Sequence, residues 1–335
     1  MKLAIVIGSP HRYPPFGRTG PCLMHEAHMR GNRVWCFQPE ALREKDGRPV
    51  AQAHELSFPP TADLGTFWRR LQLKVLSRPP ATLDLRGLDA LIWRKDPPLD
   101  RRAALLLSPL AERAACLNDP RSLLAWGSKG RAVERFGHLM PPSVVAGSLE
   151  ELLEAAEKLS GPLIVKPLEG HGGKGVVRLR PGERRALERR VASEPALARS
   201  LACGQGVLLQ REVRGPAAGD LRILCLDGRV LGAMRRIPNV GEFRASVALG
   251  ARVAPARLSA GAKSRWEAVA GELAAEGLYL VGLDVVGDRL LEANVVSPAG
   301  IPRMNALGGV RLEREVLDWL ERRAGIRSKA LKKLA

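Results

Sequence analysis

Three side chains with oxygen ligands lie close together near the end of the chain, in VGLDVVGDRLLEANVV at residues 281–296. They are Asp284, Glu292 and Asn294. If residues 287–289 form a three-residue hairpin loop, Asp284 pairs with Glu292, and Asn294 follows on the same face. Neighbouring ionised carboxylates repel each other and need cations, and such ligands suit Mg²⁺ bridged to phosphates. A two-residue loop would place the carboxylates on opposite faces and leave an ordinary polar hairpin edge.

A glycine-rich segment, KPLEGHGGKG at residues 166–175, has the spacing G-x-G-x-x-G after an apolar run. A dinucleotide-binding fingerprint would need a helix to begin at these glycines, but the following VVRLR alternates like a strand. The Walker pattern also fails, because Lys174 is followed by glycine and not by Ser or Thr. The segment therefore predicts a hairpin. Its amides, with Lys166 and Lys174, would bind a polyphosphate or would simply be solvated.

Charged residues also follow an apolar strand in the first hundred residues. KLAIVIG, a helix over residues 20–33 and RVWCF predict a β-α-β unit in a parallel sheet. ALIW at residues 90–93 predicts a further strand, and Arg94, Lys95 and Asp96 come directly after it. Open parallel sheets bind ligands at the carboxyl ends of their strands. These three residues therefore indicate a ligand site, with an ordinary polar loop as the alternative.

Beyond residue 120 the pattern becomes mixed, with helices and antiparallel strands. The turn at residues 227–228 is Asp-Gly between two apolar strands, which is a strong hairpin signal. Ser148 caps a predicted helix with Glu151 three residues later. We also predict helices at 118–136, 184–202 and 262–277, strands at 142–147 and 206–213, and a long loop at 239–254.

Composition limits the class of protein. A chain of 335 residues exceeds a usual single core, so two or three domains are expected. Lys and Arg outnumber Asp and Glu by 53 to 35, giving a net charge of +18, which suits nucleic acid or acidic small molecules. Aromatic residues make up only 4%, and no zinc-finger or RNP-type pattern occurs. An anionic small molecule is therefore preferred, and nucleic acid is not expected as a partner.

The cysteines and the apolar runs indicate a cytoplasmic protein. Five cysteines are scattered without paired spacing, as in proteins with reduced thiols. Cys22, His25 and His28 are close in sequence, but on a helix the first and last face different directions, so a surface or half-buried helix is expected there. No run approaches the roughly 20 apolar residues of a membrane span, and the first strand is too short for a signal peptide.

A lysine at 129, a lysine before a glycine hairpin and an acidic hairpin downstream describe a nucleotide held between two small sheets. With these motifs in this order, the chain resembles the bacterial glutathione synthetases of the ATP-grasp superfamily over about residues 1–323. The motifs that carry the resemblance are RKDPP at 94–98, NDPRSL at 118–123, KPLEGHGGKG at 166–175, RRIPNVGEFR at 235–244 and VGLDVVGDRLLEANVVSPAGI at 281–301.

The resemblance implies an α/β protein with the ATP-grasp fold, its ATP-binding part α+β and its N-terminal part a parallel-sheet domain. The expected division is a substrate-side domain at 1–122, a subdomain with the glycine hairpin at 123–205, a subdomain with the metal site at 206–325, and a basic tail at 326–335. It also implies ATP-dependent ligation, in which a carboxylate takes the γ-phosphate to become an acyl phosphate and an amine then displaces phosphate.

The resemblance further implies roles for individual residues. Lys129 and Lys166 would hold the phosphates, and Asp284, Glu292 and Asn294 would ligate Mg²⁺ or Mn²⁺, with two ions expected. Positive charge against the acyl phosphate would come from Arg222, Arg236 and Arg244. The remaining implied nucleotide contacts are Gly172, Gly173, Gln210, Arg211, Glu212, Val213 and Asp220.

The chain departs from this family where substrates would bind. SPHRYPPFGRTG at 9–20 replaces a Lys-Asp-Thr or Lys-Asp-Ser motif, and ASVALGA at 245–251 replaces Gly-Asn-Leu-Ala-Ala-Gly-Gly. Leu221 replaces a lysine, and VVSPAG at 295–300 replaces Val-Thr-Ser-Pro-Thr. Three hypotheses therefore remain: a glutathione synthase, a peptide or amino-acid ligase of other specificity such as a glutamyl ligase, and a basic nucleic-acid-binding protein without turnover. The oligomeric state is open, a homo-oligomer included.

The loop at 239–254 is expected to act as a lid. Gly241 and Gly250 would hinge it, and Arg244 would carry positive charge to the phosphate. An acyl phosphate in contact with water hydrolyses, so a ligase of this kind needs a cover that opens for substrates and closes for chemistry. A plain surface loop is the alternative.

Overall fold

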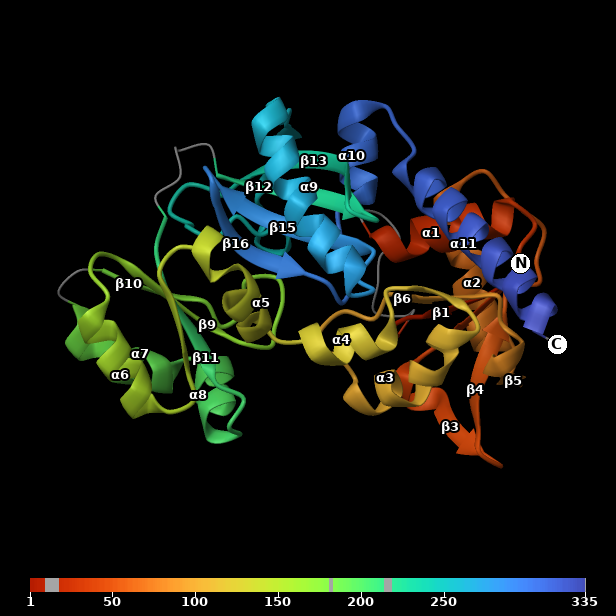
Figure 1. Cartoon of the computed structure of the whole chain (residues 1–335), viewed down its shortest axis with the longest axis horizontal. Coiled ribbons are helices and arrows are strands. Elements are labelled where there is room, and N and C mark those ends of the chain that lie inside the picture. Colours follow the sequence, from red (N-terminus) through yellow and green to blue (C-terminus); the bar gives the residue numbers. More distant parts are fainter. Residues whose placement is uncertain (10–17, 181–182, 214–218, 335) are drawn as a thin grey trace.

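The computed structural model describes residues 1–9, 18–180, 183–213 and 219–334, and the chain forms three sheets within them (Figure 1). The first sheet has the strand order β3-β4-β2-β1-β6-β7, with β5 on β4. β1 pairs in parallel with β2 and β6, and β6 with β7, which confirms the predicted parallel sheet. Its strands are β1 Lys2–Val6, β2 Arg33–Phe37, β3 Leu42–Lys45, β4 Arg48–Glu55, β5 Ala81–Asp84, β6 Ala90–Trp93 and β7 Ala115–Leu117.

Helices cover this sheet, and one of them comes from the far end of the chain. α1 Thr19–Met29 packs against α11 Leu312–Leu334, and Figure 1 shows the two side by side. The guanidinium of Arg30 pairs with Asp318 at 2.7 Å and Glu321 at 3.0 Å. α1 is consequently buried along most of its length, so the expectation of a surface or half-buried helix was wrong. α11 runs on through the predicted basic tail. The other helices here are α2 Leu64–Ser77 and α3 Arg101–Leu107.

The second sheet has the order β10-β9-β11-β8 and is antiparallel throughout. Its strands are β8 Ser143–Ala146, β9 Leu163–Pro167, β10 Val177–Leu179 and β11 Val207–Arg211, and its helices are α6 Leu149–Lys158, α7 Leu187–Ser193 and α8 Pro195–Ala202. The Ser148 hydroxyl accepts from the Glu151 amide at 3.2 Å, so the predicted cap is confirmed. The prediction of a single helix at 184–202 was wrong, because Glu194 precedes Pro195 and is held extended between α7 and α8.

A helix break also occurs at Gly127 and Ser128. The helix expected over 118–136 is two helices, α4 Pro120–Trp126 and α5 Lys129–Phe136. Ser128 is extended, and its hydroxyl accepts from the Gly130 amide at 3.2 Å, so it begins α5 as an N-cap. The break places Lys129 in the first turn of a new helix.

The third sheet is antiparallel, with the order β14-β13-β12-β15-β16. Asp227 and Gly228 form the predicted turn between β12 and β13, and both have positive φ, as a type I′ turn requires. The strands are β12 Asp220–Leu226, β13 Arg229–Ile237, β14 Arg252–Pro255, β15 Leu280–Val286 and β16 Arg289–Asn294, with helices α9 Ala260–Ala275 and α10 Ile301–Gly308. The loop before β14 therefore ends at residue 251, earlier than predicted.

Asn118 joins the first and third sheets. Its amide nitrogen donates to the carbonyls of Leu280 at 2.9 Å and Val295 at 2.8 Å, and its oxygen accepts from the Leu280 amide at 2.7 Å. One apolar core also spans these sheets, including Trp126 and Trp266. Three separate sheets support the division at 122 and 205, which stays a prediction. Within the described residues, no helix is long and apolar enough to cross a membrane.

Removing the Asn118 amide should loosen this junction. Asn118→Ala leaves three buried backbone groups without their partners, and we expect a loss of about 2–4 kcal/mol in the free energy of unfolding. Urea unfolding followed by tryptophan fluorescence measures it. Asn239→Ala, at an exposed position, is the matched control and should change stability by less than about 0.5 kcal/mol. Equal stability of the two variants would contradict a joining role for Asn118.

Candidate active site

The acidic hairpin pairs Asp284 with Glu292 as predicted, but its turn differs from the predicted one. The turn has two residues, because Val286 pairs with Arg289, so the predicted three-residue loop was wrong. A regular two-residue hairpin would place Leu291 opposite Asp284. A bulge after Asp284 leaves Leu291 unpaired and moves Glu292 opposite Asp284. The expected pairing of the two carboxylates is thus confirmed, and bulged strands often occur beside active sites.

Asp284 is buried among cationic and amide donors. Arg222 donates to it through Nε at 2.6 Å and Nη2 at 3.1 Å, and Arg236 Nη2 lies 3.0 Å from Oδ2. Asn294 Nδ2 donates to the same oxygen at 3.2 Å. Burial acts to raise the pKa of Asp284, but the charges of Arg222 and Arg236 outweigh it and hold the pKa at about 2. The carboxylate is therefore ionised at neutral pH.

Asp220 extends this cluster on the neighbouring strands. Both of its oxygens accept from Arg236, at 2.8 and 2.6 Å. Burial raises the pKa of Asp220 above its usual value, although Arg236 acts in the opposite direction. The resemblance implied that Asp220 contacts the nucleotide, and in the structure its carboxylate pairs with Arg236. Two carboxylates and two guanidiniums thus alternate across the three strands β13, β12 and β15.

Two lysines face this sheet from the other side of the site. Lys129 Nζ lies 3.7 Å from Glu292 Oε1 and donates to the Gly170 carbonyl at 3.1 Å. Lys166 is buried and donates to Gln210 Oε1 at 3.3 Å and to the Leu291 carbonyl at 3.2 Å. Burial lowers the pKa of Lys166, while the charge of Glu292 raises it. Figure 1 shows α5, which begins with Lys129, between the second sheet and the β15–β16 hairpin.

The segment 210–213, which the resemblance implies would contact the nucleotide, begins at the end of β11. Gln210 is buried, and its amide nitrogen donates to the Ser143 hydroxyl at 2.9 Å. Arg211 is exposed, and Glu212 pairs with Arg178 at 2.9 Å. Val213 is half-buried and is the last described residue before 214–218. Only Gln210 of this segment is in direct contact with Lys166.

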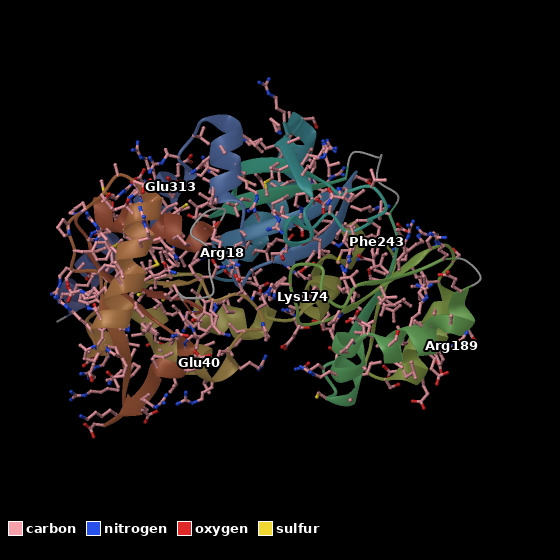
Figure 2. All side chains as sticks on the ribbon, turned by 180° about the vertical axis from the view of Figure 1, so that it is seen from behind. Arg18, Glu40, Lys174, Arg189, Phe243 and Glu313 are labelled. Atoms are coloured by element: carbon pink, nitrogen blue, oxygen red, sulfur yellow. The ribbon has the colours of Figure 1, made fainter. Side chains whose placement is uncertain are left out.

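The glycine-rich segment is a hairpin, since β10 pairs with β9 in antiparallel fashion and no helix begins at its glycines. Gly172 and Gly173 both have positive φ. Their carbonyls accept from the loop predicted as a lid: Ser246 Oγ donates to Gly172 and Arg244 Nη1 to Gly173, each at 2.9 Å. In Figure 2, Lys174 of the hairpin lies between Arg18, which precedes α1, and Phe243 of the loop.

Arg244 has a partner that the sequence did not indicate. Glu242 accepts from its Nε at 2.9 Å and its Nη2 at 2.7 Å, and from the backbone amides of Phe243 and Arg244. The bonds from Arg244 lower the pKa of Glu242 to about 2. Arg244 is therefore held beside the glycine hairpin and does not contact Asp284, whereas Arg222 and Arg236 do. The i, i+2 spacing of glutamate and arginine in a loop is the only signal that could have found this pair.

A pocket lies at the carboxyl ends of β1 and β6, where the sequence indicated a ligand site. Its lining consists of Ile7, Gly8, Arg18, Thr19, Gly20, Pro21, Met24, Trp68, Arg94, Asp96 and Ala299. Arg94 and Asp96 were predicted, and Lys95 is absent from the lining. Of the departures at 9–20, residues 10–17 lie outside the described structure. The sequence missed Arg18 and Trp68, although the first turn of a helix after a first parallel strand is a known ligand position.

Comparison with known proteins agrees with the motifs and the geometry. Residues 1–123 match the model of the prokaryotic glutathione synthetase N-terminal domain, and residues 131–309 match that of its ATP-grasp domain. A glutathione synthetase of Parasynechococcus marenigrum is 36% identical over 96% of this chain and 99% of its own. Those of Prochlorococcus marinus and Synechocystis sp. are 34% and 31% identical over the same share of this chain, and over 98% and 99% of their own.

Solved structures show the same fold at lower identity. D-cycloserine synthetase DcsG has a TM-score of 0.62 and 17% identity, covering 96% of this chain and all of its own. The D-alanine–D-alanine ligase of Bacillus anthracis has a TM-score of 0.57 and 14% identity, covering 98% of this chain and 99% of its own. With its parallel N-terminal sheet and two antiparallel sheets around the lysines and acids, the protein has the ATP-grasp fold. The chain belongs to the prokaryotic glutathione synthetase family.

Proposed function

We propose that this protein is an ATP-dependent carboxylate–amine ligase that makes glutathione from γ-glutamylcysteine and glycine, with release of ADP and phosphate. The observation that carries this proposal is the facing arrangement of Asp284 and Glu292 with Lys129 and Lys166. Family membership and full-length relatives named glutathione synthetase support it. We also propose a cytoplasmic location, with ATP and small carboxylate and amine substrates as the binding partners.

The donor set fits a divalent cation. Asp284 and Glu292 are opposite each other on the hairpin, and Asn294 lies two residues further along. Among the described residues, Asp284 Oδ1 accepts one hydrogen bond, from Arg222 Nε. A carboxylate oxygen has two acceptor positions, so one remains for a cation. Mg²⁺ or Mn²⁺ held here would neutralise charge on the transferred phosphoryl group. We propose two ions. An ATP-grasp ligase, PsnB, has been solved with Mg and ADP.

The side chains of this protein would position and neutralise charged substrates. Lys129 and Lys166 would bind the ATP phosphates, replacing their present contacts to Glu292 and to carbonyl oxygens. A substrate carboxylate oxygen attacks the γ-phosphorus, and the bond from phosphorus to the ADP oxygen breaks. Arg222 and Arg236 would then neutralise the negative charge that accumulates on the acyl phosphate. In-line transfer of this kind depends on positioning more than on covalent help from the protein.

The second step forms the amide. The amine nitrogen attacks the acyl carbon, the tetrahedral intermediate collapses with loss of phosphate, and the amine proton leaves to solvent or to the departing phosphate. Arg244 would leave Glu242 and stabilise the oxyanion when the loop closes over the substrates. Gly172, Gly173, the segment 210–213 and Asp220 are proposed to contact the nucleotide.

An ADP-release assay tests the reaction and its substrates. We expect ADP with γ-glutamylcysteine plus glycine, and glutathione in equal amount by mass spectrometry. Other carboxylates with other amines serve as the comparison, since D-cycloserine synthetase and D-alanine–D-alanine ligase share this fold. ADP release only with another carboxylate and amine would show that the protein catalyses a different ligation. No release with any pair would contradict ligase activity.

Glu292→Gln should reduce turnover by about 100-fold or more, because the amide keeps the shape but removes charge that holds the cation near the phosphoryl group. Steady-state rates over a range of Mg²⁺ concentrations measure the effect, and higher Mg²⁺ should restore part of it. Glu272→Gln is the matched control, since Glu272 is exposed and, among the described residues, pairs with Arg135 and with neither lysine. Normal turnover of Glu292→Gln at low Mg²⁺ would exclude Glu292 as a ligand.

Arg244→Ala should reduce amide formation far more than ATP affinity if the loop at 239–251 is a lid. Limited proteolysis within this loop should be suppressed by ATP, Mg²⁺ and the carboxylate substrate together, because bound ligands would add contacts to the hydrogen bonds that Ser246 and Arg244 already make to the glycine hairpin. Arg252→Ala, at an exposed position on β14, is the control. Equal cleavage with and without ligands, together with normal turnover of Arg244→Ala, would show that the loop is only a connector.

A further inference from the structure

His171 lies in the middle of the glycine-rich hairpin, and its backbone is fixed on both sides. The carbonyl of Gly170 accepts from Lys129 Nζ at 3.1 Å, and that of Gly172 accepts from Ser246 Oγ at 2.9 Å. Lys129 is the first residue of α5, and Ser246 belongs to the loop predicted as a lid. The hairpin therefore holds His171 between a lysine proposed to bind the ATP phosphates and the loop proposed to close over them.

The imidazole of His171 is exposed, and it makes no hydrogen bond within the part of the chain that the structure describes. Its pKa is nevertheless lowered, and the largest cause is desolvation by the surrounding protein. A side chain that is exposed and yet surrounded by protein lies in an open cleft. His171 thus offers a ligand one donor and one acceptor nitrogen, and it is uncharged at neutral pH.

The charges that act on this imidazole come from three further parts of the chain as well as from its own hairpin. After desolvation, the largest effect on the pKa of His171 is that of Asp96, which raises it. Lys174, Lys129 and Arg18 all act to lower the pKa. Asp96 is itself paired with Arg18 at 2.9 Å. Three cations and one paired carboxylate therefore keep the imidazole in its uncharged form.

The remaining charged groups near the hairpin do not reverse this balance. Arg244 Nη1 donates to the Gly173 carbonyl at 2.9 Å, but Arg244 is paired with Glu242 at 2.7 Å, so the charges of the lid loop cancel. The hairpin segment also carries Glu169, two residues before His171.

His171 faces both halves of the candidate site. Asp96 lines the pocket at the carboxyl ends of β1 and β6, and Lys129 lies 3.7 Å from Glu292 on the acidic hairpin. A polyphosphate held by Lys129 would bring several negative charges next to the imidazole. Opposite charge within about 4–6 Å favours the protonated form of such a group. Nucleotide binding should therefore change the charge of this side chain.

We propose that His171 is a ligand of the ATP phosphates that takes up a proton from solution when the nucleotide binds and then donates a hydrogen bond to a phosphate oxygen as an imidazolium. The free ring nitrogen accepts the proton, and the proton returns to solution when ADP and phosphate leave. ATP affinity thus depends on pH through this side chain. The inference rests on the proposed function for the identity of the nucleotide, but it concerns binding and not turnover.

Calorimetric titration of the full chain tests the proton uptake. A non-hydrolysable ATP analogue with Mg²⁺ is titrated at about pH 7.5 in two buffers of different ionisation enthalpy, which gives the number of protons taken up. We expect the wild type to take up roughly half a proton more per nucleotide than His171→Gln, which keeps hydrogen bonding but does not titrate. Lys166, whose pKa is also lowered by burial, is present in both proteins, so their difference reports His171.

The pH dependence of affinity gives a second measurement. A group that is protonated in the complex and uncharged in the free protein adds affinity that is lost as the pH rises. Between about pH 7 and about pH 8.5 the association constant of the wild type should therefore fall by about 3- to 10-fold more than that of His171→Gln. His171→Lys carries a permanent charge. At about pH 8.5 it should bind the analogue about 3-fold or more tighter than the wild type, with no more proton uptake than His171→Gln.

His138→Gln is the matched control, because it makes the same substitution at another exposed histidine. It should keep the wild-type affinity and proton uptake at every pH. If His171→Gln does not fold, His171→Lys supplies the comparison of both quantities with the wild type.

The outcomes separate this inference from the proposed function. Equal proton uptake by the wild type and the His171 variants, or no gain in affinity from His171→Lys at the higher pH, would overturn the role of His171. Absence of nucleotide binding would contradict both the inference and the ligase. The expected difference in proton uptake, without ADP release for any carboxylate and amine, would sustain the role of His171 and contradict ligase activity.

Discussion

The buried charge cluster of the third sheet is the constraint on which the site depends. Asp220 is directly opposite Arg236, and Arg222 is directly opposite Asp284, so the strand register creates both pairs. Arg236 also bonds to Asp284 and links them. One ion buried without its partner would be strongly destabilising, and a slip of one residue would separate every pair. The register of β12, β13 and β15 is therefore held by the same groups that would meet the acyl phosphate.

The contacts of Lys129 and Lys166 across the site differ from the ion pairs of the charge cluster. Glu292 is held by Lys129 at 3.7 Å, and Lys166 donates to neutral oxygens of Gln210 and Leu291. These interactions are longer than the ion pairs within the cluster, and the lysines come from α5 and from β9 of the second sheet. A nucleotide phosphate with a cation can replace them without disturbing the arginines. The arrangement thus separates permanent ion pairs, which fix the acids, from exchangeable ones, which ligands would take over.

Much of the fold could be predicted from sequence because local patterns and global packing agree. Alternating apolar residues and the Asp227-Gly228 turn predicted β12 and β13, and failure of the helix signal after the glycines predicted β9 and β10. The predicted three-residue loop of the acidic hairpin was wrong, since no local signal marks a bulge at Leu291. The predicted pairing of Asp284 with Glu292 was nevertheless correct. Several contacts could not be predicted from the sequence. The Glu242–Arg244 pair depends on the local conformation of its loop, whereas the burial of α1 under α11 and the contact of Arg94 with the Pro298 carbonyl depend on segments brought together by folding.

Three consecutive residues after β16 connect the N-terminal pocket to the charge cluster. Ser297 Oγ donates to Asp96, the Pro298 carbonyl accepts from Arg94, and the Ala299 carbonyl accepts from Arg222. Two of these three contacts use backbone carbonyls, so the distance between the N-terminal pocket and the charge cluster is set by the backbone. The departure of VVSPAG from the expected Val-Thr-Ser-Pro-Thr run changes side chains, whereas both carbonyl contacts are made by backbone groups that any residue supplies. A substitution at Ala299 would therefore act on the pocket through its side chain and would keep the carbonyl that Arg222 uses.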